Sequence, residues 1–299
     1  MKKCLLIINP YSGKLKMQNE LMNVIQILNE NNYNVQVQIT LKHNHAREIA
    51  ATATNIDLII CSGGDGTLNQ VVAGVIDSGN NIPIGYIPSG STNDFANTLG
   101  ISADIQKATK DIINGQILNI DIGQFNNQSY FTYVAAFGIF AEVSYSTPQP
   151  IKNRLGHLAY ILSGLNNISN IKPYTVTVFE SNQEDNLSFE MSYKENYIMG
   201  MVMNSTSVGG VLKLNQVDLA DGLFEVLLIR QPKDLIEFNS ILTGLITSDF
   251  SGKMFNYFKT KHVKFLFDDE MVWSLDGEEQ KAGKHAVINN LNKKINIIK

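Results

Sequence analysis

The sequence predicts two parts of different character, an open parallel α/β domain followed by a β-rich, antiparallel domain. From residue 2 to about residue 125, short apolar runs alternate with amphipathic segments, which is the pattern of a parallel α/β sheet. Beyond that region, β-branched and aromatic runs follow one another with few helical segments between them. The length of 299 residues agrees with two domains. We place the first domain at residues 1–125, with 286–299 as a candidate completion of it, and the second at 126–285.

The elements of the first half alternate in type. In 20–28 the apolar residues recur at helical spacing, whereas 57–61 is a continuous apolar run of the kind that forms a buried strand. The predicted strands are Lys3–Ile8, Val35–Ile39, Asp57–Cys61 and Ile84–Ile87, and the predicted helices are Leu15–Asn29, His45–Ala53, Leu68–Asp77 and Ala103–Asn114.

The second half contains mainly strand patterns, with two helical interruptions. The predicted strands are Ile117–Phe125, Tyr174–Phe179, Tyr197–Val202, Leu223–Ile229 and Val263–Phe267, and the predicted helices are Arg154–Leu165 and Lys233–Thr247.

Composition and hydrophobic pattern argue against a nucleic-acid-binding protein, a disulfide-bonded protein and a membrane-spanning protein. A formal net charge of -4 argues against a nucleic-acid partner, because phosphate contacts are normally made by clustered Lys and Arg. Cys4 and Cys61 lie in apolar runs that read as buried strands, so reduced thiols are expected rather than a disulfide. No apolar run approaches the roughly 20 residues that span a bilayer. We therefore expect a cytoplasmic protein whose contact with any membrane is peripheral.

The most informative segment is Ser62–Asn69, with the sequence SGGDGTLN. It follows an apolar strand and precedes a helix predicted to begin near Leu68, with Thr67 as its cap. Glycine amides at such a turn can bind phosphate oxygens, and Asp65 is placed to hold Mg²⁺. The alternative is a tight turn before a capped helix, and one such motif does not decide between them.

Two further turns have similar polar residues, and each also follows a predicted strand. They are Asn9–Lys14 (NPYSGK) and Pro88–Asp94 (PSGSTND). Because the carboxyl ends of parallel strands meet at one edge of a sheet, the three turns are predicted to converge on a ligand there. A Walker loop and a dinucleotide-binding Gly-x-Gly-x-x-Gly are both absent from the sequence, so those two nucleotide folds are excluded.

In this order and spacing, NPYSGK, SGGDGTLNQVV and PSGSTNDFA resemble the diacylglycerol kinase catalytic family, which includes bacterial and sphingosine-type lipid kinases. DLADGL at 218–223 and LDGE at 275–278 resemble later motifs of that family. The resemblance implies a NAD kinase-like first domain, a β-sandwich second domain, and ATP- and Mg²⁺-dependent phosphorylation of a lipid hydroxyl, diacylglycerol giving phosphatidic acid. Alternatives are another lipid, of the phosphatidylglycerol or sphingoid type, a soluble substrate as in NAD kinases, or a nucleotide-binding protein without activity.

The resemblance also implies roles for individual residues. Asp65 and Asp94 would hold the catalytic Mg²⁺, and Glu278 would be the general base with Asp276 beside it, although Asp65 remains an alternative base. A plain hairpin turn is the alternative for the segment around Glu278. The implied ATP contacts are Asn9, Ser12, Gly13, Lys14, Thr40, Gly63, Gly64, Asp65, Gly66, Thr67, Leu68, Asn69, Gly90, Ser91, Thr92 and Asn93.

A second, structural Mg²⁺ site is implied at Asp218, Asp221 and Leu223, where an Asp-Gly turn between strands is the alternative. The sequence departs from the family at Ser91, where Thr is usual, and at Ile139-Phe140, which leaves the preferred lipid open.

The expected partner is a membrane lipid reached by peripheral contact with the inner face, and a homodimer is left open. Lysines interleaved with aromatic residues over 253–264 are a candidate membrane patch, but such alternation is also typical of a half-buried strand.

Overall fold

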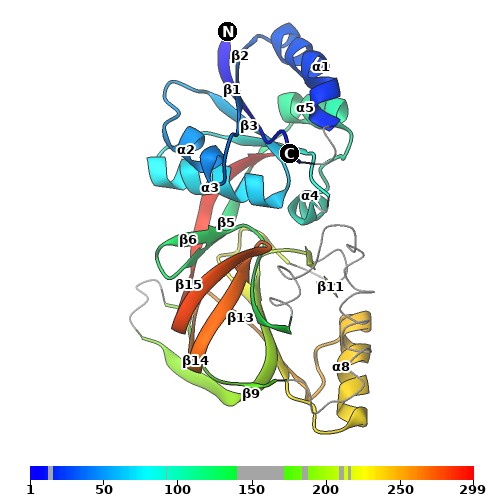
Figure 1. Cartoon of the computed structure of the whole chain (residues 1–299), viewed down its shortest axis with the longest axis vertical. Coiled ribbons are helices and arrows are strands. Elements are labelled where there is room, and N and C mark those ends of the chain that lie inside the picture. The colour runs from blue at the N-terminus through cyan, green and yellow to red at the C-terminus, as the bar shows by residue number, and fades with distance from the viewer. Residues whose placement is uncertain (13–15, 92, 140–171, 184–187, 209–211, 215–216) are drawn as a thin grey trace. The chain divides into compact units, whose positions relative to one another are not determined.

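The computed structural model describes residues 1–12, 16–91, 93–139, 172–183, 188–208, 212–214 and 217–299. They form two compact units, which Figure 1 shows in full. Unit 1 contains Met1–Ile122 and Asn292–Lys299, and unit 2 contains Gly123–Leu291. Each unit has its own hydrophobic core.

Unit 1 is built on a parallel sheet in the order β2-β1-β3-β4-β15. Its strands are β1 (Lys2–Ile8), β2 (Tyr33–Ile39), β3 (Leu58–Gly63), β4 (Ile84–Pro88) and the last residues of β15 (Glu278–Ile298). The connection after β1 leads to β2 on one side, and the connection after β3 leads to β4 on the other side, so the carboxyl ends of β1 and β3 form a topological switch point. Ligands of open α/β sheets bind at such points.

Helices cover the two faces of this sheet (Figure 1). α1 (Lys16–Glu30) packs against α5 (Ile105–Asn114), and α2 (His45–Ala51) packs against α3 (Asp65–Ser78). A short helix, α4 (Asp94–Leu99), follows β4. The apolar stripe of α1 is buried through Met17, Val24 and Leu28, whose spacing places them on one face of the helix.

Unit 2 consists mainly of antiparallel strands. Four of them form a closed ring of pairings, in which β7 pairs with β9, β9 with β8, β8 with β14 and β14 with β7. Aromatic side chains fill the core of this unit, with Phe137 and Trp273 4.9 Å apart between ring centres and both fully buried. The elements are β5 (Ile117–Phe125), β6 (Ser129–Phe131), β7 (Val134–Gly138), β8 (Tyr174–Ser181), β9 (Glu190–Met203), β10 (Ser207–Val208), β11 (Leu212–Lys213), β12 (Phe224–Arg230), α8 (Leu235–Thr247), β13 (Phe255–Thr260) and β14 (His262–Leu275).

The predicted combination of an α/β part and a β-rich part is confirmed, and most predicted elements are found within a few residues of their expected limits. The pairings differ from a β-sandwich because the four-strand ring joins what would be two separate sheets. The long strand β15 and the short strands β6, β7, β10 and β11 were not predicted. The predicted helix Arg154–Leu165 lies outside the described residues.

Candidate active site

The turn after β3 leads directly into α3. The helix begins at Asp65, and Gly64 is its N-cap with an extended backbone at φ -93°. The prediction that Thr67 caps a helix starting near Leu68 is therefore wrong. Thr67 lies in the first turn of α3, where its hydroxyl accepts a hydrogen bond from the Asn9 side-chain amide at 3.0 Å. Gly63 permits this arrangement, because a Cβ at Gly63 would lie 2.4 Å from the Thr67 Cβ.

The ends of β1 and β2 are joined to the same edge. The Asn9 amide donates to the Ser62 carbonyl at 2.9 Å, and the Thr40 amide donates to the Ile8 carbonyl at 2.9 Å. Thr40 is buried, directly after β2. The turn after β1 is thus hydrogen-bonded to the end of β3 through the Asn9 backbone and to the first turn of α3 through the Asn9 side chain.

The turn after β4 lies against the turn after β3. The amides of Ser89 and Gly90 both donate to the Gly63 carbonyl, at 2.8 and 3.1 Å. A Cβ on Gly90 would lie 2.5 Å from the Gly64 Cα, which is closer than non-bonded carbon atoms can approach. Gly90 therefore allows the two backbones to touch. The sequence predicted that the glycine amides of these turns bind phosphate oxygens. The structure shows a further reason for glycine, which is the close approach of Gly90 to Gly64.

The resemblance implies that ATP binds at these turns. Replacing Gly90 with Ala is then expected to push the two turns apart and to weaken ATP binding by about tenfold or more, the scale of a misplaced binding group. Equilibrium titration of the variant with ATP would measure the change. Gly252→Ala is the matched control, since its Cβ would meet only Phe255, at 3.9 Å, and should leave affinity unchanged. Equal affinities for Gly90→Ala and the wild type would contradict the prediction.

Three serine hydroxyls connect the turns. The Ser12 hydroxyl donates to the Asn9 carbonyl at 2.9 Å and lies 2.9 Å from the Ser89 hydroxyl, which lies 3.3 Å from that of Ser62. Ser62 and Ser89 are buried. Ser89 was not among the predicted site residues, because it gave no signal beyond its place in a strand-end turn.

Two carboxylates lie where α4 begins. Both oxygens of Asp65 accept backbone amides there, from Asp94 at 3.1 Å and from Phe95 at 3.2 Å. Asp94 itself is fully buried. A carboxylate oxygen has two lone pairs, so accepting a backbone amide does not by itself prevent it from binding a cation.

Tyr86 is a buried neighbour of these two acids. Its hydroxyl lies 3.3 Å from the Gly63 carbonyl and 3.4 Å from the Asn93 side-chain oxygen, and its single proton can be shared between these two acceptors. Burial raises the pKa of Tyr86 well above its usual value, and the charges of Asp65 and Asp94 raise it further, so the hydroxyl stays neutral. Tyr86 was not predicted, although a tyrosine in an otherwise aliphatic strand was an available signal.

Asn93 closes the turn after β4. It adopts the left-handed conformation, with φ 54°, and exchanges two hydrogen bonds with Gly90, each of 3.0 Å. Asn tolerates this conformation better than most residues, which explains its use before α4.

In unit 2, Glu278 follows a tight turn between β14 and β15. Asp276 and Gly277 occupy the turn with positive φ of 49° and 91°, as a two-residue hairpin requires. The Asp276 carboxylate is buried and accepts four hydrogen bonds, of 2.6 to 3.1 Å, from the amides of Thr132, Tyr133 and Val134 and the hydroxyl of Thr132. Glu278 and Glu279 are exposed. Asp276 thus fixes the turn through its hydrogen bonds, and Glu278 remains the predicted base of the two.

The predicted structural metal site is also in unit 2. Asp218 accepts the Ala220 amide at 3.0 Å, and Asp221 accepts the Leu223 amide at 2.9 Å. In both aspartates one oxygen accepts an amide in this way, and the second oxygen of Asp221 lies 3.7 Å from the Lys259 ammonium. No group of three or more His, Cys, Asp or Glu placed to hold a metal occurs among the described residues. Two carboxylates and a backbone carbonyl remain a donor set suited to a hard cation.

Comparison with known proteins decides the family. The family model "Diacylglycerol kinase catalytic domain" matches residues 3–125. The diacylglycerol kinase of Bacillus subtilis (strain 168) is 35% identical over 283 residues, which cover 93% of this chain and 90% of the relative. The diacylglycerol kinase of Staphylococcus aureus (strain MRSA252) is 34% identical, over 89% of this chain and 80% of the relative. The chain belongs to the diacylglycerol kinase family. It is accordingly a lipid kinase.

Solved structures agree on the fold. The crystal structure of a diacylglycerol kinase from Bacillus anthracis str. Sterne superposes with a TM-score of 0.76, covers 99% of this chain and 96% of its own, and is 20% identical. At that identity the likeness concerns the fold alone. Diacylglycerol kinase family membership and fold therefore rest on separate comparisons.

Of the described residues assigned by resemblance to the diacylglycerol kinase family, Leu68 lies where its side chain could not contact a ligand. Leu68 is fully buried and its amide donates to the Gly64 carbonyl, so it belongs to the core of unit 1. Gly66 and Asn69 are half-buried and Ser91 is exposed. Gly13, Lys14, Thr92 and Phe140 lie outside the described residues.

The candidate membrane patch forms the strand β13 and its flanks. Lys259 lies 2.8 Å from the buried carboxylate of Glu225 and 3.7 Å from Asp221, and Lys253 lies 3.3 Å from Glu237. Two of its lysines are thus paired within unit 2, as expected of an ordinary half-buried strand. No helix in the described part of this lipid kinase is long and apolar enough to cross a membrane.

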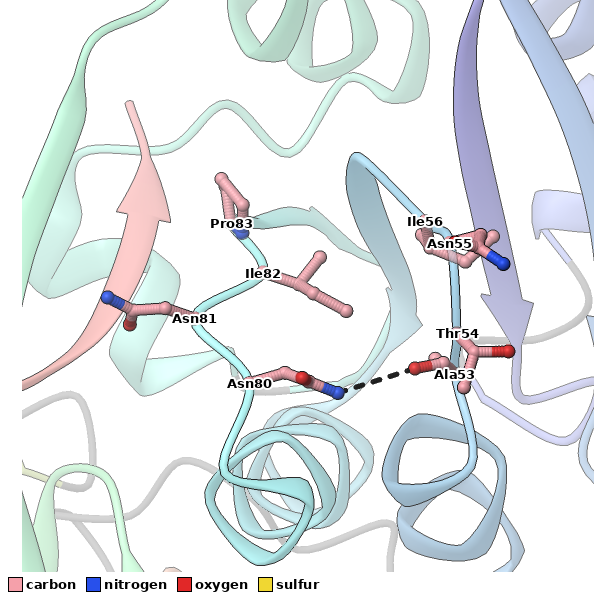
Figure 2. A pocket seen from close by; sticks show the side chains of 8 residues that line it. All are labelled: Ala53, Thr54, Asn55, Ile56, Asn80, Asn81, Ile82 and Pro83. Carbon is pink, nitrogen blue, oxygen red and sulfur yellow. Dashed lines mark hydrogen bonds between the residues drawn. The ribbon is translucent and has the colours of Figure 1, made fainter.

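A cavity of about 370 Å³ lies elsewhere in unit 1 (Figure 2). Residues 53–56 and 80–83 line it, just before β3 and β4 begin, so it opens at the amino edge of the sheet. The Asn80 side chain reaches across it to the Ala53 carbonyl at 3.5 Å. No charged residue lines this cavity, and none of the residues predicted to bind ATP belongs to it.

Proposed function

We propose that this lipid kinase transfers the γ-phosphoryl group of ATP to the free hydroxyl of diacylglycerol and forms phosphatidic acid, with Mg²⁺ as the metal. The observation that carries the proposal is the convergence of three polar turns at the carboxyl edge of the parallel sheet. Ligands bind such edges, and backbone amides of glycine turns suit phosphate. The names of the relatives support diacylglycerol as acceptor.

The turns would bind the triphosphate through their amides and hydroxyls, and Lys14 would balance its charge. Asn9, Ser12 and Gly13 from the first turn, Thr40, Gly63 to Asn69, and Gly90 to Asn93 form this proposed set, with Leu68 contributing through packing. Asp65 and Asp94 would hold the catalytic Mg²⁺, directly or through water. When bound, this ion would neutralise the negative charge on the phosphate oxygens. The second Mg²⁺ would be held by Asp218, Asp221 and the Leu223 carbonyl.

Glu278 would take the proton from the lipid hydroxyl as its oxygen attacks the γ-phosphorus. The bond from that phosphorus to the bridging oxygen breaks, and ADP leaves with the electron pair. Asp276 would keep the turn carrying Glu278 fixed. Neither Asp65 nor Asp94 needs to form a covalent intermediate. We further propose that the reaction takes place in the cytoplasm, at the inner face of the membrane, where the enzyme docks peripherally.

A kinase assay with labelled ATP tests the proposal. Diacylglycerol, phosphatidylglycerol, ceramide and sphingosine would be presented separately in mixed micelles, and NAD without detergent. We expect labelled phosphatidic acid from diacylglycerol as the main product. If another lipid is the main acceptor, that lipid is the substrate. Phosphorylation of NAD would indicate a kinase for a soluble substrate. ATP binding without any phosphoryl transfer would indicate a nucleotide-binding protein without activity.

A further inference from the structure

The three connected serines determine where each hydroxyl proton lies. Ser12 uses its single proton in the bond to the Asn9 carbonyl, so in its contact with Ser89 it must accept. Ser89 therefore donates to Ser12. Because the one proton of Ser89 is then used, Ser62 must donate to Ser89. The hydroxyls form a chain with one direction, from Ser62 through Ser89 and Ser12 to the Asn9 carbonyl.

This direction has a consequence for Ser12. With this direction, the Ser12 proton points toward the Asn9 carbonyl, 2.9 Å away. The Asn9 carbonyl also accepts the Ser12 amide at 3.3 Å, so it keeps a partner if the Ser12 proton turns away. Ser89 would continue to donate its hydrogen bond to Ser12 while the Ser12 hydroxyl rotates. A hydroxyl that accepts a hydrogen bond is a stronger donor, because hydrogen bonds in a chain polarise one another.

The position of Ser89 suits such a role. Its side chain is 2% exposed, and its amide donates to the Gly63 carbonyl at 2.8 Å, so the strand end of β3 fixes it in place. It therefore lies too deep to reach a ligand itself and can act only through Ser12, which is half-buried.

We propose that Ser89 is a positioning residue for ATP binding. It orients the Ser12 oxygen and polarises the Ser12 hydroxyl, whose proton turns from the Asn9 carbonyl to a phosphate oxygen when the nucleotide binds. This inference rests on the proposed function, in which Ser12 binds the phosphates of ATP.

The test is equilibrium binding of ATP to the full-length protein, with melting curves to verify that each variant folds. Ser89→Ala should raise the dissociation constant about three- to tenfold, the loss expected for one hydrogen bond. The KM for ATP should rise correspondingly, while the KM for the lipid stays constant. Ser62→Ala should change the ATP dissociation constant less than about twofold, since Ser89 can still donate to Ser12.

A double-mutant cycle separates this role from a loss of packing. If Ser89 acts through Ser12, the double variant Ser12→Ala/Ser89→Ala should bind ATP as weakly as Ser12→Ala alone. Ser89→Cys fills the space of the removed hydroxyl with a weak donor, so it should resemble Ser89→Ala. Additive losses in the cycle, full affinity in Ser89→Cys, or wild-type affinity in Ser89→Ala would each overturn the role of Ser89. Failure of the wild type to bind ATP would overturn the proposed function as well.

Discussion

Replacing Glu278 with Gln is expected to lower the rate of phosphoryl transfer by about 10²- to 10⁴-fold, the contribution of a general base. Gln has nearly the same shape but cannot take a proton from the lipid hydroxyl. Because ATP is proposed to bind at unit 1, the affinity for ATP should stay unchanged. Steady-state kinetics with diacylglycerol micelles, together with an ATP titration, would measure both quantities.

The neighbouring acid provides the control for this experiment. Glu279 is also exposed on β15, and Glu279→Gln removes the same charge one residue away. Since successive side chains of a strand point to opposite faces, Glu279 should not replace Glu278, and its variant should keep nearly full activity. Full activity in Glu278→Gln would remove Glu278 as the base and make Asp65 the next candidate. A strong loss in Glu279→Gln would exchange the roles of the two glutamates.

Replacing Asp276 with Ala is expected to destabilise the protein by about 3 kcal/mol or more, because buried amides would lose their acceptor. The four hydrogen bonds to this carboxylate join the turn after β14 to residues 132–134, where β7 begins. Without them the turn that carries Glu278 would lose its fixed position, and activity should fall together with stability. Urea unfolding and the lipid kinase assay would measure the two effects.

A matched control for Asp276 lies on the same strand. Asp269 is an exposed carboxylate of β14, and Asp269→Ala should change the free energy of unfolding by about 0.5 kcal/mol or less, as is usual at the surface. Wild-type stability in Asp276→Ala would show that the observed hydrogen bonds contribute little. If Asp276→Ala is destabilised but fully active, the position of the turn does not determine the catalytic rate.

The strand ends of the first unit could be predicted from sequence because their signals are local. β3 is a continuous apolar run that ends in glycines, so its limits and its turn follow from the residues themselves. The start of α3 could not be predicted in the same way. Thr67 has a good capping side chain, but its hydroxyl is used by Asn9, which is 58 positions earlier in the chain. The contact between Asn9 and Thr67 depends on tertiary structure.

The buried residues Tyr86 and Ser89 were not predicted as part of the site, because their contacts also depend on tertiary structure. Tyr86 stands out in an otherwise aliphatic strand, but neither it nor Ser89, in the turn that follows, shows in the sequence which residues its hydroxyl contacts. Their partners come from β3 and from the turn after β1. The long strand β15 was missed because it mixes charged and apolar residues, and because its last residues pair with the distant β4. Such pairings are determined by topology rather than by local preference.

The parallel sheet of the first unit takes its last strand from residues that follow the whole second unit. Ile297 and Ile298 pair with Ile84 and Gly85, so among the described strands this late segment is the one that covers the edge of β4 opposite β3. On the ribosome, the N-terminal part of the chain would wait with an exposed sheet edge until the second unit has been synthesised. Unpaired edges invite association with other chains, so this delay is a stage at which newly made protein would be most exposed to aggregation and most dependent on chaperones.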